Sequence, residues 1–126
     1  MALLNSSDAE RLTKEKNLWL STVSSESIPH IVPIWFVLHE SKLYICTGKH
    51  SIKAKHIRNN PNIAFALEDG INPVSGIGKC IIKDIKKINS SIITKFKEKY
   101  DWDITTDKDY TLLIEIEIEK MLLRKK

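Results

Sequence analysis

Three apolar segments in the first half of the chain are separated by turns that are too short to contain a helix. They are NLWLSTVS (residues 17–24), HIVPIWFVL (30–38) and KLYICT (42–47). Each is rich in β-branched and large apolar residues, which is typical of β-strands. Antiparallel strands can be joined by a tight turn, whereas parallel strands need a crossover of about a dozen residues or more. The spacing therefore predicts an antiparallel sheet and argues against a doubly wound parallel fold.

Three helices are expected outside this sheet. The first begins at Ser7, because SDAE has the spacing of a capping box, and it ends near Lys16. The second is short, covers residues 51–59 and is stopped by an Asn-Pro pair. The third covers residues 90–102, where apolar side chains recur at helical spacing.

Three further strands are expected, at residues 62–68, 74–85 and 110–120. Gly76 and Gly78 lie inside the second of them, and a glycine there marks a bulge or the close approach of another backbone or a ligand. The last strand alternates apolar and acidic residues, which predicts one face in water. About six antiparallel strands with helices outside predict a small closed or half-closed barrel. We expect residues 1–126 to form a single domain.

Pro33 lies inside the second apolar segment. Proline has no N–H to donate to a strand partner, so its position is expected at a sheet edge, at a bulge or beside a ligand. The adjacent Trp35 and Phe36 are either ordinary core residues or a flat apolar wall beside a binding site. The sequence leaves both interpretations open.

The composition restricts the function only weakly. Lys and Arg exceed Asp and Glu by 20 to 16, and the net charge of +4 permits an anionic ligand or nucleic acid without requiring either. The N-terminal residues have no basic flank and no long apolar run, so we expect neither a signal peptide nor a membrane anchor, and a cytoplasmic location is the default. Cys46 and Cys80 are far apart, which favours two buried thiols but leaves a disulfide or a metal pair open. No spacing typical of a hydrolase or of a metal site is present.

Cations gather at the start of the second predicted helix, in CTGKHSIKAKHIRNNP (residues 46–61). If Ser51 caps this helix, its first amides point outward and form an anion site. Lys53 lies in the first turn, where a cation opposes the helix dipole and is better explained beside a bound anion. The incoming loop adds further donors, namely Thr47, Lys49 and His50. A solvated basic turn, a phosphate site and a nucleic-acid patch all remain open, and the spacing is not that of a P-loop.

The combination of an anion site and an apolar strand suits a planar ring that carries a phosphate. The ring would rest on the strand that contains Pro33 and Trp35, and the phosphate would lie at the helix start. Flavin mononucleotide (FMN) has this shape.

Residues 17–84 resemble the pyridoxamine 5′-phosphate oxidase-like flavin-binding split barrels. The resemblance rests on an ordered set of motifs: TV in a strand, then P-H-x-x-P-x-W-F, then L-Y-x-x-T and finally S-x-K-x-x-x-I-x-x-N-P. It implies a mainly β fold, a six-stranded antiparallel split barrel of Greek-key type with about three peripheral helices. It also implies a homodimer with one FMN at each side of the subunit interface.

The resemblance assigns cofactor-binding roles by position. Four residues would line the flavin ring, partly through backbone groups: Val32, Pro33, Ile34 and Trp35. Four more would hold the ribityl chain and the phosphate: Cys46, Thr47, Ser51 and Lys53. The start of a later strand would approach the ring edge: Pro73, Val74 and Ser75.

The sequence departs from the family pattern at several positions. Many relatives carry an arginine immediately before the phosphate lysine, but Ile52 stands there, so Lys49 or His50 is expected to substitute. Pro73 stands where the true oxidases have a glutamine. The chain also lacks their C-terminal substrate-binding segment, although Arg124 could still reach a partner subunit. Oxidation of pyridoxamine phosphate itself is therefore not expected.

The expected function is that of an FMN-dependent oxidoreductase acting on an unidentified small molecule, with no assignable catalytic residue. A deazaflavin-dependent reductase on the same fold and a flavin-binding protein without turnover are alternatives. A nucleic-acid-binding barrel is a third, because cations follow the second helix: Lys49, Lys53, Lys55, His56 and Arg58. That alternative needs exposed aromatic side chains for base stacking. The aromatic residues lie in apolar strands instead, so nucleic acid is not an expected partner, and neither is a membrane.

Overall fold

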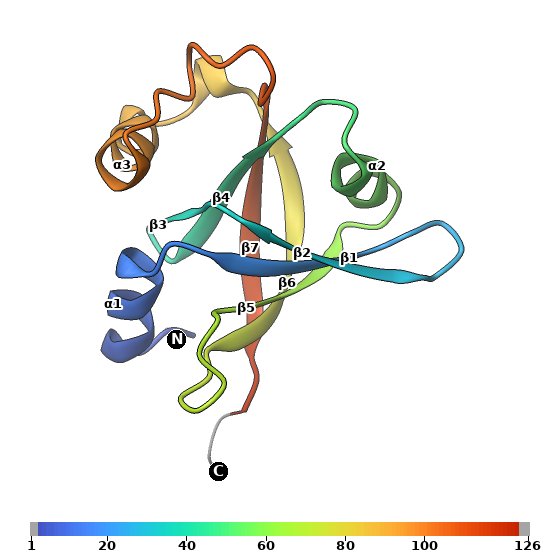
Figure 1. Ribbon diagram of the computed structural model, residues 1–126, viewed down its shortest axis with the longest axis vertical. Helices are drawn as coiled ribbons and strands as arrows, with labels where there is room; N and C mark the ends of the chain where they lie inside the picture. The colour runs from blue at the N-terminus through green and yellow to red at the C-terminus, as the bar shows by residue number, and fades with distance from the viewer. Residues whose placement is uncertain (1–2, 124–126) are drawn as a thin grey trace.

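One antiparallel sheet forms the body of the protein in the computed structural model, which describes residues 3–123 (Figure 1). Its strands are β1 (Leu18–Val23), β2 (Pro29–Ile34), β3 (Val37–His39), β4 (Lys42–Thr47), β5 (Asn62–Ala66), β6 (Ser75–Lys83) and β7 (Leu112–Met121). Their order across the sheet is β2-β1-β5-β6-β7-β4-β3. The sheet curls into an open half-barrel, which confirms the mainly β, split-barrel-like fold. Arg124 lies outside the described residues.

Three helices pack outside the sheet: α1 (Ser6–Lys14), α2 (Ile52–Asn59) and α3 (Ser90–Tyr100), with a short 3-10 turn, η1, at Ile85–Lys87. Figure 1 shows α1 and α3 on one side of the half-barrel and α2 on the other. Among the described residues, no helix has the length and apolar character needed to span a membrane.

The sheet has seven strands, so the prediction of six was wrong. The segment predicted as one strand, residues 30–38, is divided between β2 and β3, which pair at opposite edges of the sheet. Trp35 and Phe36 connect them. The Tyr100 hydroxyl replaces a strand partner there, because it accepts the Phe36 N–H at 3.0 Å and lies 2.9 Å from the Phe36 carbonyl oxygen.

The edge position expected for Pro33 is confirmed. Pro33 lies opposite Trp19 of β1, and β2 has no strand on its other side. Pro29 and Pro33 are four residues apart, so both side chains lie on the same face of the strand as that of Ile31. Prolines at this spacing reduce the number of N–H groups that the open edge can offer to a further strand.

Both strand glycines are required by the close approach of neighbouring atoms. A Cβ at Gly76 would lie 2.7 Å from the Phe65 ring, and one at Gly78 would lie 2.3 Å from the Glu117 carbonyl oxygen. The register of β6 against β7 shifts between Ile77 and Gly78. Of the alternatives predicted for these glycines, the close approach of another backbone is confirmed at Gly78, and the ladder is irregular beside it.

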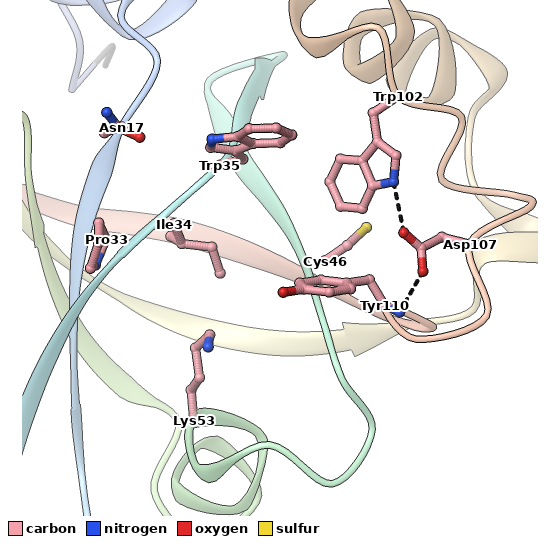
Figure 2. A pocket seen from close by; sticks show the side chains of 9 residues that line it. All are labelled: Asn17, Pro33, Ile34, Trp35, Cys46, Lys53, Trp102, Asp107 and Tyr110. Carbon is pink, nitrogen blue, oxygen red and sulfur yellow. Dashed lines mark hydrogen bonds between the residues drawn. The ribbon is translucent and has the colours of Figure 1, made fainter.

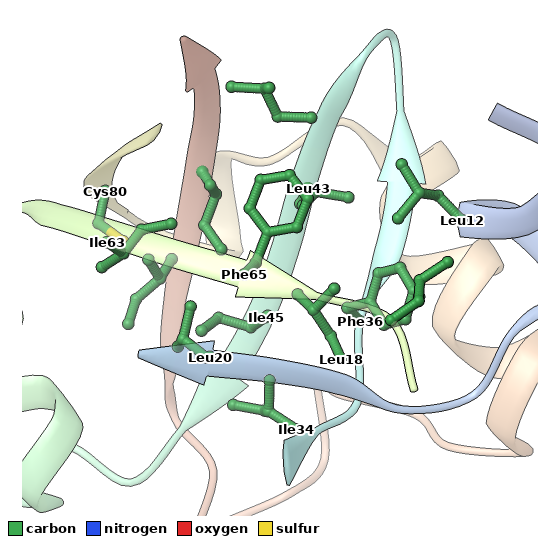
Figure 3. Close-up of a cluster of buried hydrophobic side chains, with 14 of the residues drawn as sticks. Leu12, Leu18, Leu20, Ile34, Phe36, Leu43, Ile45, Ile63, Phe65 and Cys80 are labelled. Atoms are coloured by element: carbon green, nitrogen blue, oxygen red, sulfur yellow. The ribbon is translucent and has the colours of Figure 1, made fainter. Parts of the chain in front are cut away.

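Two hydrophobic clusters hold the fold together. The larger fills the inside of the barrel around Leu20, Ile45 and Phe65 (Figure 3). The smaller lies under α3, where Ile92 and Phe96 pack on the outer faces of β4 and β7. Because α3 covers those faces, β4 and much of β7 are buried on both sides.

The predicted wet face of β7 is wrong at one position. Glu115 is only 6% exposed, whereas Glu117 and Glu119 face water as expected. The Tyr44 hydroxyl donates a hydrogen bond of 2.8 Å to the Glu115 carboxylate. Alternation along a strand does not show that a distant helix covers part of its outer face.

The first helix starts earlier than predicted. Asn5 is its N-cap, accepting the Asp8 N–H at 2.8 Å, and the Asp8 carboxylate accepts the Asn5 N–H in return. This capping box has the same three-residue spacing as the predicted one, which began at Ser7. Glu10 pairs with Lys14 at 2.8 Å instead.

Candidate functional site

The start of α2 is capped as the sequence predicts. The Ser51 hydroxyl oxygen accepts the Ala54 N–H at 3.1 Å and the Thr47 hydroxyl at 3.0 Å. The Ser51 N–H in turn donates to the Gly48 carbonyl oxygen at 3.1 Å. These bonds fix the loop against the helix and leave the amides of Ile52 and Lys53 without a backbone acceptor among the described residues.

A hollow of about 530 Å³ opens at this helix start, and we call it the helix-mouth hollow. The loop before α2 and the segment before β7 line it, and its charged residues are Lys49, His50, Lys53, Lys108 and Asp109. The positive charge of the lysines and free amides exceeds the negative charge of the single carboxylate. The hollow therefore suits an anion.

A second hollow, of about 450 Å³, lies on the sheet side of Lys53 and is here called the aromatic hollow (Figure 2). It is lined by Asn17, Pro33, Ile34, Trp35, Cys46, Lys53, Trp102, Asp107 and Tyr110. Lys53 and Tyr110 line both hollows, so the two are contiguous. A ligand with an anionic end and a flat apolar end matches this arrangement.

Lys53 stands between the two hollows. Its side chain is half-buried, and burial lowers the pKa of its amine. Within residues 3–123 it has no carboxylate partner and no hydrogen-bond acceptor. An ammonium group that is withdrawn from water without a partner is costly, and a bound anion would remove that cost.

The wall of the aromatic hollow is a set of ring contacts. Trp35 stacks on Tyr100 with ring centroids 4.5 Å apart, and Trp102 meets Trp35 edge-on at 5.9 Å. Tyr110 meets Trp102 edge-on at 5.8 Å. Trp35 is 46% exposed, whereas Phe36 is fully buried. The sequence left open whether these residues are core or form an apolar wall. Phe36 is a core residue, and Trp35 forms part of the wall of the aromatic hollow.

Asp107 holds the loop that carries this wall. Its carboxylate accepts the Trp102 Nε1–H at 2.9 Å and the N–H groups of Asp109 and Tyr110 at 2.8 and 2.9 Å (Figure 2). The backbone bonds from Tyr110 and Asp109 lower the pKa of Asp107, so it stays ionised. The carboxylate is a positioning group and shows no sign of acting as an acid.

Cys46 faces the aromatic hollow as a protonated thiol. Burial, and secondarily the Asp107 charge, raise the pKa of Cys46 to about 12. A thiol of this kind is a poor nucleophile at neutral pH, so Cys46 can only contact a ligand. Cys46 and Cys80 are both free and buried, as the simplest interpretation of the sequence predicts.

The family model described as pyridoxamine 5′-phosphate oxidase matches residues 7–125. The chain belongs to this family. The match covers nearly the whole chain and includes both hollows. Among curated proteins, none matches the sequence.

Solved structures share the fold of this pyridoxamine 5′-phosphate oxidase family member. An F420 reductase is 19% identical with a TM-score of 0.75, covering 94% of this chain and 98% of its own. The heme storage protein HutZ from Vibrio cholerae is 16% identical with a TM-score of 0.75, covering 95% and 92%. General Stress Protein 26 from Bacillus anthracis is 24% identical with a TM-score of 0.65, covering 89% and 86%. At these identities the likeness shows the fold alone.

Most of the residues assigned by resemblance come together in this family member. The aromatic hollow includes Pro33, Ile34, Trp35 and Cys46, and the helix-mouth hollow includes Thr47, Lys49, His50 and Ser51, with Lys53 in both. Val32, Val74 and Ser75 line neither hollow. Val32 is 36% exposed on the edge strand, and Val74 is buried in the barrel core. Whether these residues bind a cofactor stays a prediction.

Sequence reasoning missed the loop between α3 and β7. It supplies Trp102, Asp107 and Tyr110 to the aromatic hollow and Lys108 to the helix-mouth hollow. A signal was available, because two aspartates in DWDITTDKDY accept backbone N–H groups two residues on and form tight turns, and aromatic residues flank both. What could not be inferred was that this loop meets the start of α2.

His56 is not part of an exposed basic stripe. It is 8% exposed, and its Nδ1 lies 2.8 Å from the Thr22 hydroxyl, with the His30 ring edge-on at 4.6 Å. This corrects the stripe on which a nucleic-acid surface was considered. Lys49, Lys55 and Arg58 remain exposed.

Proposed function

We propose that this member of the pyridoxamine 5′-phosphate oxidase family binds FMN across the two hollows and acts as an FMN-dependent oxidoreductase on a small molecule. The observation that carries the proposal is the contiguity of an aromatic hollow with a basic helix start through Lys53 and Tyr110. Each hollow alone is a common surface feature, whereas the pair matches one phosphorylated ring system.

The proposed phosphate position is supported by donors that have no partner among residues 3–123. The amides of Ile52 and Lys53 open α2, the Lys53 side chain lines both hollows, and Lys49 and His50 lie in the loop beside them. Ile52 is 62% exposed where relatives carry arginine, so Lys49 or His50 would supply the second positive charge. A phosphate dianion here would form charge-assisted bonds of about 1.5–3 kcal/mol each.

The ring end is supported by the shape and polarity of the aromatic hollow. Ile34 and Trp35 offer apolar surface, and Asp107 fixes Trp102, which meets the Trp35 ring edge-on, together with Tyr110. When bound, FMN would supply the electron and hydride transfer. The residues of the chain would bind it, orient it and exclude water, and none is placed as a proton donor.

A homodimer is part of the proposal. Both faces of β2 are exposed, with Ile31 at 62% and Val32 at 36%, and Trp35 follows them at 46%. A second copy covering this strand would shield apolar surface and close the open side of the aromatic hollow. In that arrangement the exposed Val32 would lie beside a cofactor shared between the copies, whereas Val74 would stay in the barrel core.

A deazaflavin is the second candidate cofactor, favoured by the likeness of fold to an F420 reductase. The purified protein should be examined for a bound yellow chromophore and then titrated with FMN, a deazaflavin and haemin. Turnover should be assayed with NADH, NADPH and reduced deazaflavin. Tight binding of FMN with turnover supports the proposal, and binding without turnover reduces it to a flavin store or sensor. Preference for deazaflavin or haemin would replace it.

Nucleic-acid binding is the alternative from another class. It is weakened by the burial of His56, although Trp35 and Tyr110 are exposed enough to stack on bases. Binding of single-stranded DNA at two salt concentrations tests it directly, because phosphate contacts make the affinity fall steeply with salt.

A further inference from the structure

A second group of lysines lies beside the candidate site, in a groove between α1, β3 and α3. The groove has a volume of about 440 Å³ and an apolar floor of Val37 and Leu38. Lys16, Lys95 and Lys99 stand along its sides. Figure 1 shows α1 and α3 on the same side of the barrel.

These three ammonium groups have no carboxylate partner among the described residues. Lys95 donates to the Leu38 carbonyl oxygen at 2.8 Å, Lys99 donates to that of Leu12 at 3.3 Å, and Lys16 donates to the Lys99 carbonyl oxygen. Of the other charged residues, Lys14 pairs with Glu10 and Glu15 pairs with Arg11, and Glu98 is the one carboxylate among the described residues that line the groove. The groove therefore carries a clear excess of positive charge.

Lys99 is also withdrawn from water. Its Nζ lies 3.8 Å from the centroid of the Phe36 ring, which is fully buried. Burial and the neighbouring charge of Lys16 lower the pKa of Lys99 to about 8. Capping of helix carbonyls accounts for Lys16 and Lys99 individually. It does not account for three cations that line one groove in which Glu98 is the single carboxylate among the described residues, an arrangement that a bound anion would stabilise.

The lysine groove adjoins the aromatic hollow. Lys16 is followed by Asn17, which lines the hollow, and the Lys16 Nζ lies 5.2 Å from the Tyr100 ring centroid. Tyr100 in turn stacks on Trp35 of the hollow wall. The groove and the hollow share no lining residue, so one organic molecule with a charged end in the groove and its other end at the hollow would have to pass over Tyr100.

We propose that the lysine groove binds the anionic end, a phosphate or a carboxylate group, of the small molecule whose other end reaches the aromatic hollow. The second half of this statement rests on the proposed function, whereas anion binding in the groove does not. The proposal predicts a substrate class: organic phosphates or polycarboxylates bind in preference to neutral molecules of the same size.

The test uses pyrophosphate and citrate as probes in isothermal titration calorimetry. Because the helix mouth can also attract anions, titrations are made on the FMN-loaded protein and, in parallel, on the Lys53→Gln variant. We expect Lys16→Gln and Lys95→Gln each to weaken probe binding at least tenfold. Lys99→Arg, which keeps the charge, should retain it. Lys120→Gln, an exposed lysine on β7, is the matched control and should have no effect.

The outcomes separate the two proposals. The probe that binds with the higher affinity identifies whether the natural group is a phosphate or a carboxylate. FMN affinity within twofold of wild type in the groove variants shows that the groove is distinct from the cofactor site. Probe binding with no FMN binding keeps the groove and rejects the proposed function. No binding of either probe at millimolar concentration, or binding unchanged by the groove variants, overturns the inference. Binding of single-stranded DNA in the groove, in place of either probe, also overturns the inference.

Discussion

Glu115 is buried and Lys53 is half-buried, and these two charged side chains differ in what surrounds them. Glu115 accepts the Tyr44 hydroxyl at 2.8 Å, and the ammonium groups of Lys42 and Lys83 lie 3.7 and 4.0 Å away. Lys53 lies between two hollows and has no such partner within residues 3–123. A buried charge with its partners in place is part of the structure, whereas one without partners marks the place of a ligand.

The surroundings of Glu115 confirm that its site is complete. The burial of Tyr44 and its bond to Glu115 raise the pKa of the Tyr44 hydroxyl, which therefore stays a hydrogen-bond donor. The two lysines are each more than two-fifths exposed and can be rehydrated. Changes at Glu115 should consequently alter stability, and changes at Lys53 should alter binding.

The largest expected effect is on folding. Glu115→Ala should lower the free energy of unfolding by about 2–3 kcal/mol, because it leaves the Tyr44 hydroxyl buried without an acceptor. FMN affinity should not change. Urea denaturation measures the first quantity, and Glu117→Ala, an exposed change on the same strand, should stay within about 0.5 kcal/mol. Equal stability of the Glu115→Ala variant and wild type would show that this buried contact contributes nothing.

The next effect is on binding. Lys53→Gln should weaken FMN binding by about 1.5–3 kcal/mol, because a charge-assisted contact to the phosphate is lost. The unfolding free energy without ligand should be unchanged or slightly higher, since an unpaired ammonium group is no longer buried. Fluorescence titration measures the affinity.

Two controls sharpen this result. Riboflavin, which lacks the phosphate, should bind wild type and Lys53→Gln equally. Lys55→Gln, an exposed change on the same helix, should leave FMN affinity unaltered. If Lys53→Gln weakened both flavins alike, Lys53 would act on the ring or on the fold and not on the phosphate.

A smaller effect concerns the wall of the hollow. Trp35→Ala should lower FMN affinity and the unfolding free energy by about 1 kcal/mol each, because both the ligand contact and the stack on Tyr100 are lost. Trp35→Phe should recover most of both. A stability loss with unaltered affinity would place the ring of the cofactor elsewhere.

The smallest effect is the pH dependence that Lys99 contributes. Its folded pKa of about 8 lies below the ordinary value of 10.5, so between these pH values the unfolded chain binds a proton that the folded chain does not. Its contribution to stability therefore rises with pH across that window and is a constant penalty below it. The side chain is partly exposed, so the gain should be under about 1 kcal/mol. Denaturation at pH 7 and pH 10 should show this rise in the free energy of unfolding in wild type and not in the Lys99→Met variant.

The sequence was sufficient for features that depend on neighbouring residues. The Ser51 cap, the edge position of Pro33 and the close approaches at Gly76 and Gly78 all follow from local chemistry, and all are confirmed. The resemblance brought most residues of the two hollows together, because its motifs lie on strands that follow one another along the chain and on the helix that comes after them.

Features that depend on distant segments were not predictable. Residues 30–38 divide into two strands because Tyr100, 64 positions away from Phe36, bonds to the Phe36 backbone. Glu115 is buried beside Tyr44 of β4, where the segment between β6 and α3 lines the same hollow. The loop between α3 and β7 meets the start of α2 because β4 pairs with β7, which places Thr47 opposite Leu112. In each case the deciding contact joins residues whose proximity no local pattern shows.

The central claim is that the start of α2 and the aromatic hollow together hold one phosphorylated ring system. A crystal structure of the protein with FMN tests it most directly. We predict the phosphate within hydrogen-bond distance of the Lys53 ammonium and the first amides of α2, with the ring against Trp35. FMN bound elsewhere, or a carboxylate of a partner subunit occupying the Lys53 ammonium in its place, would contradict the account.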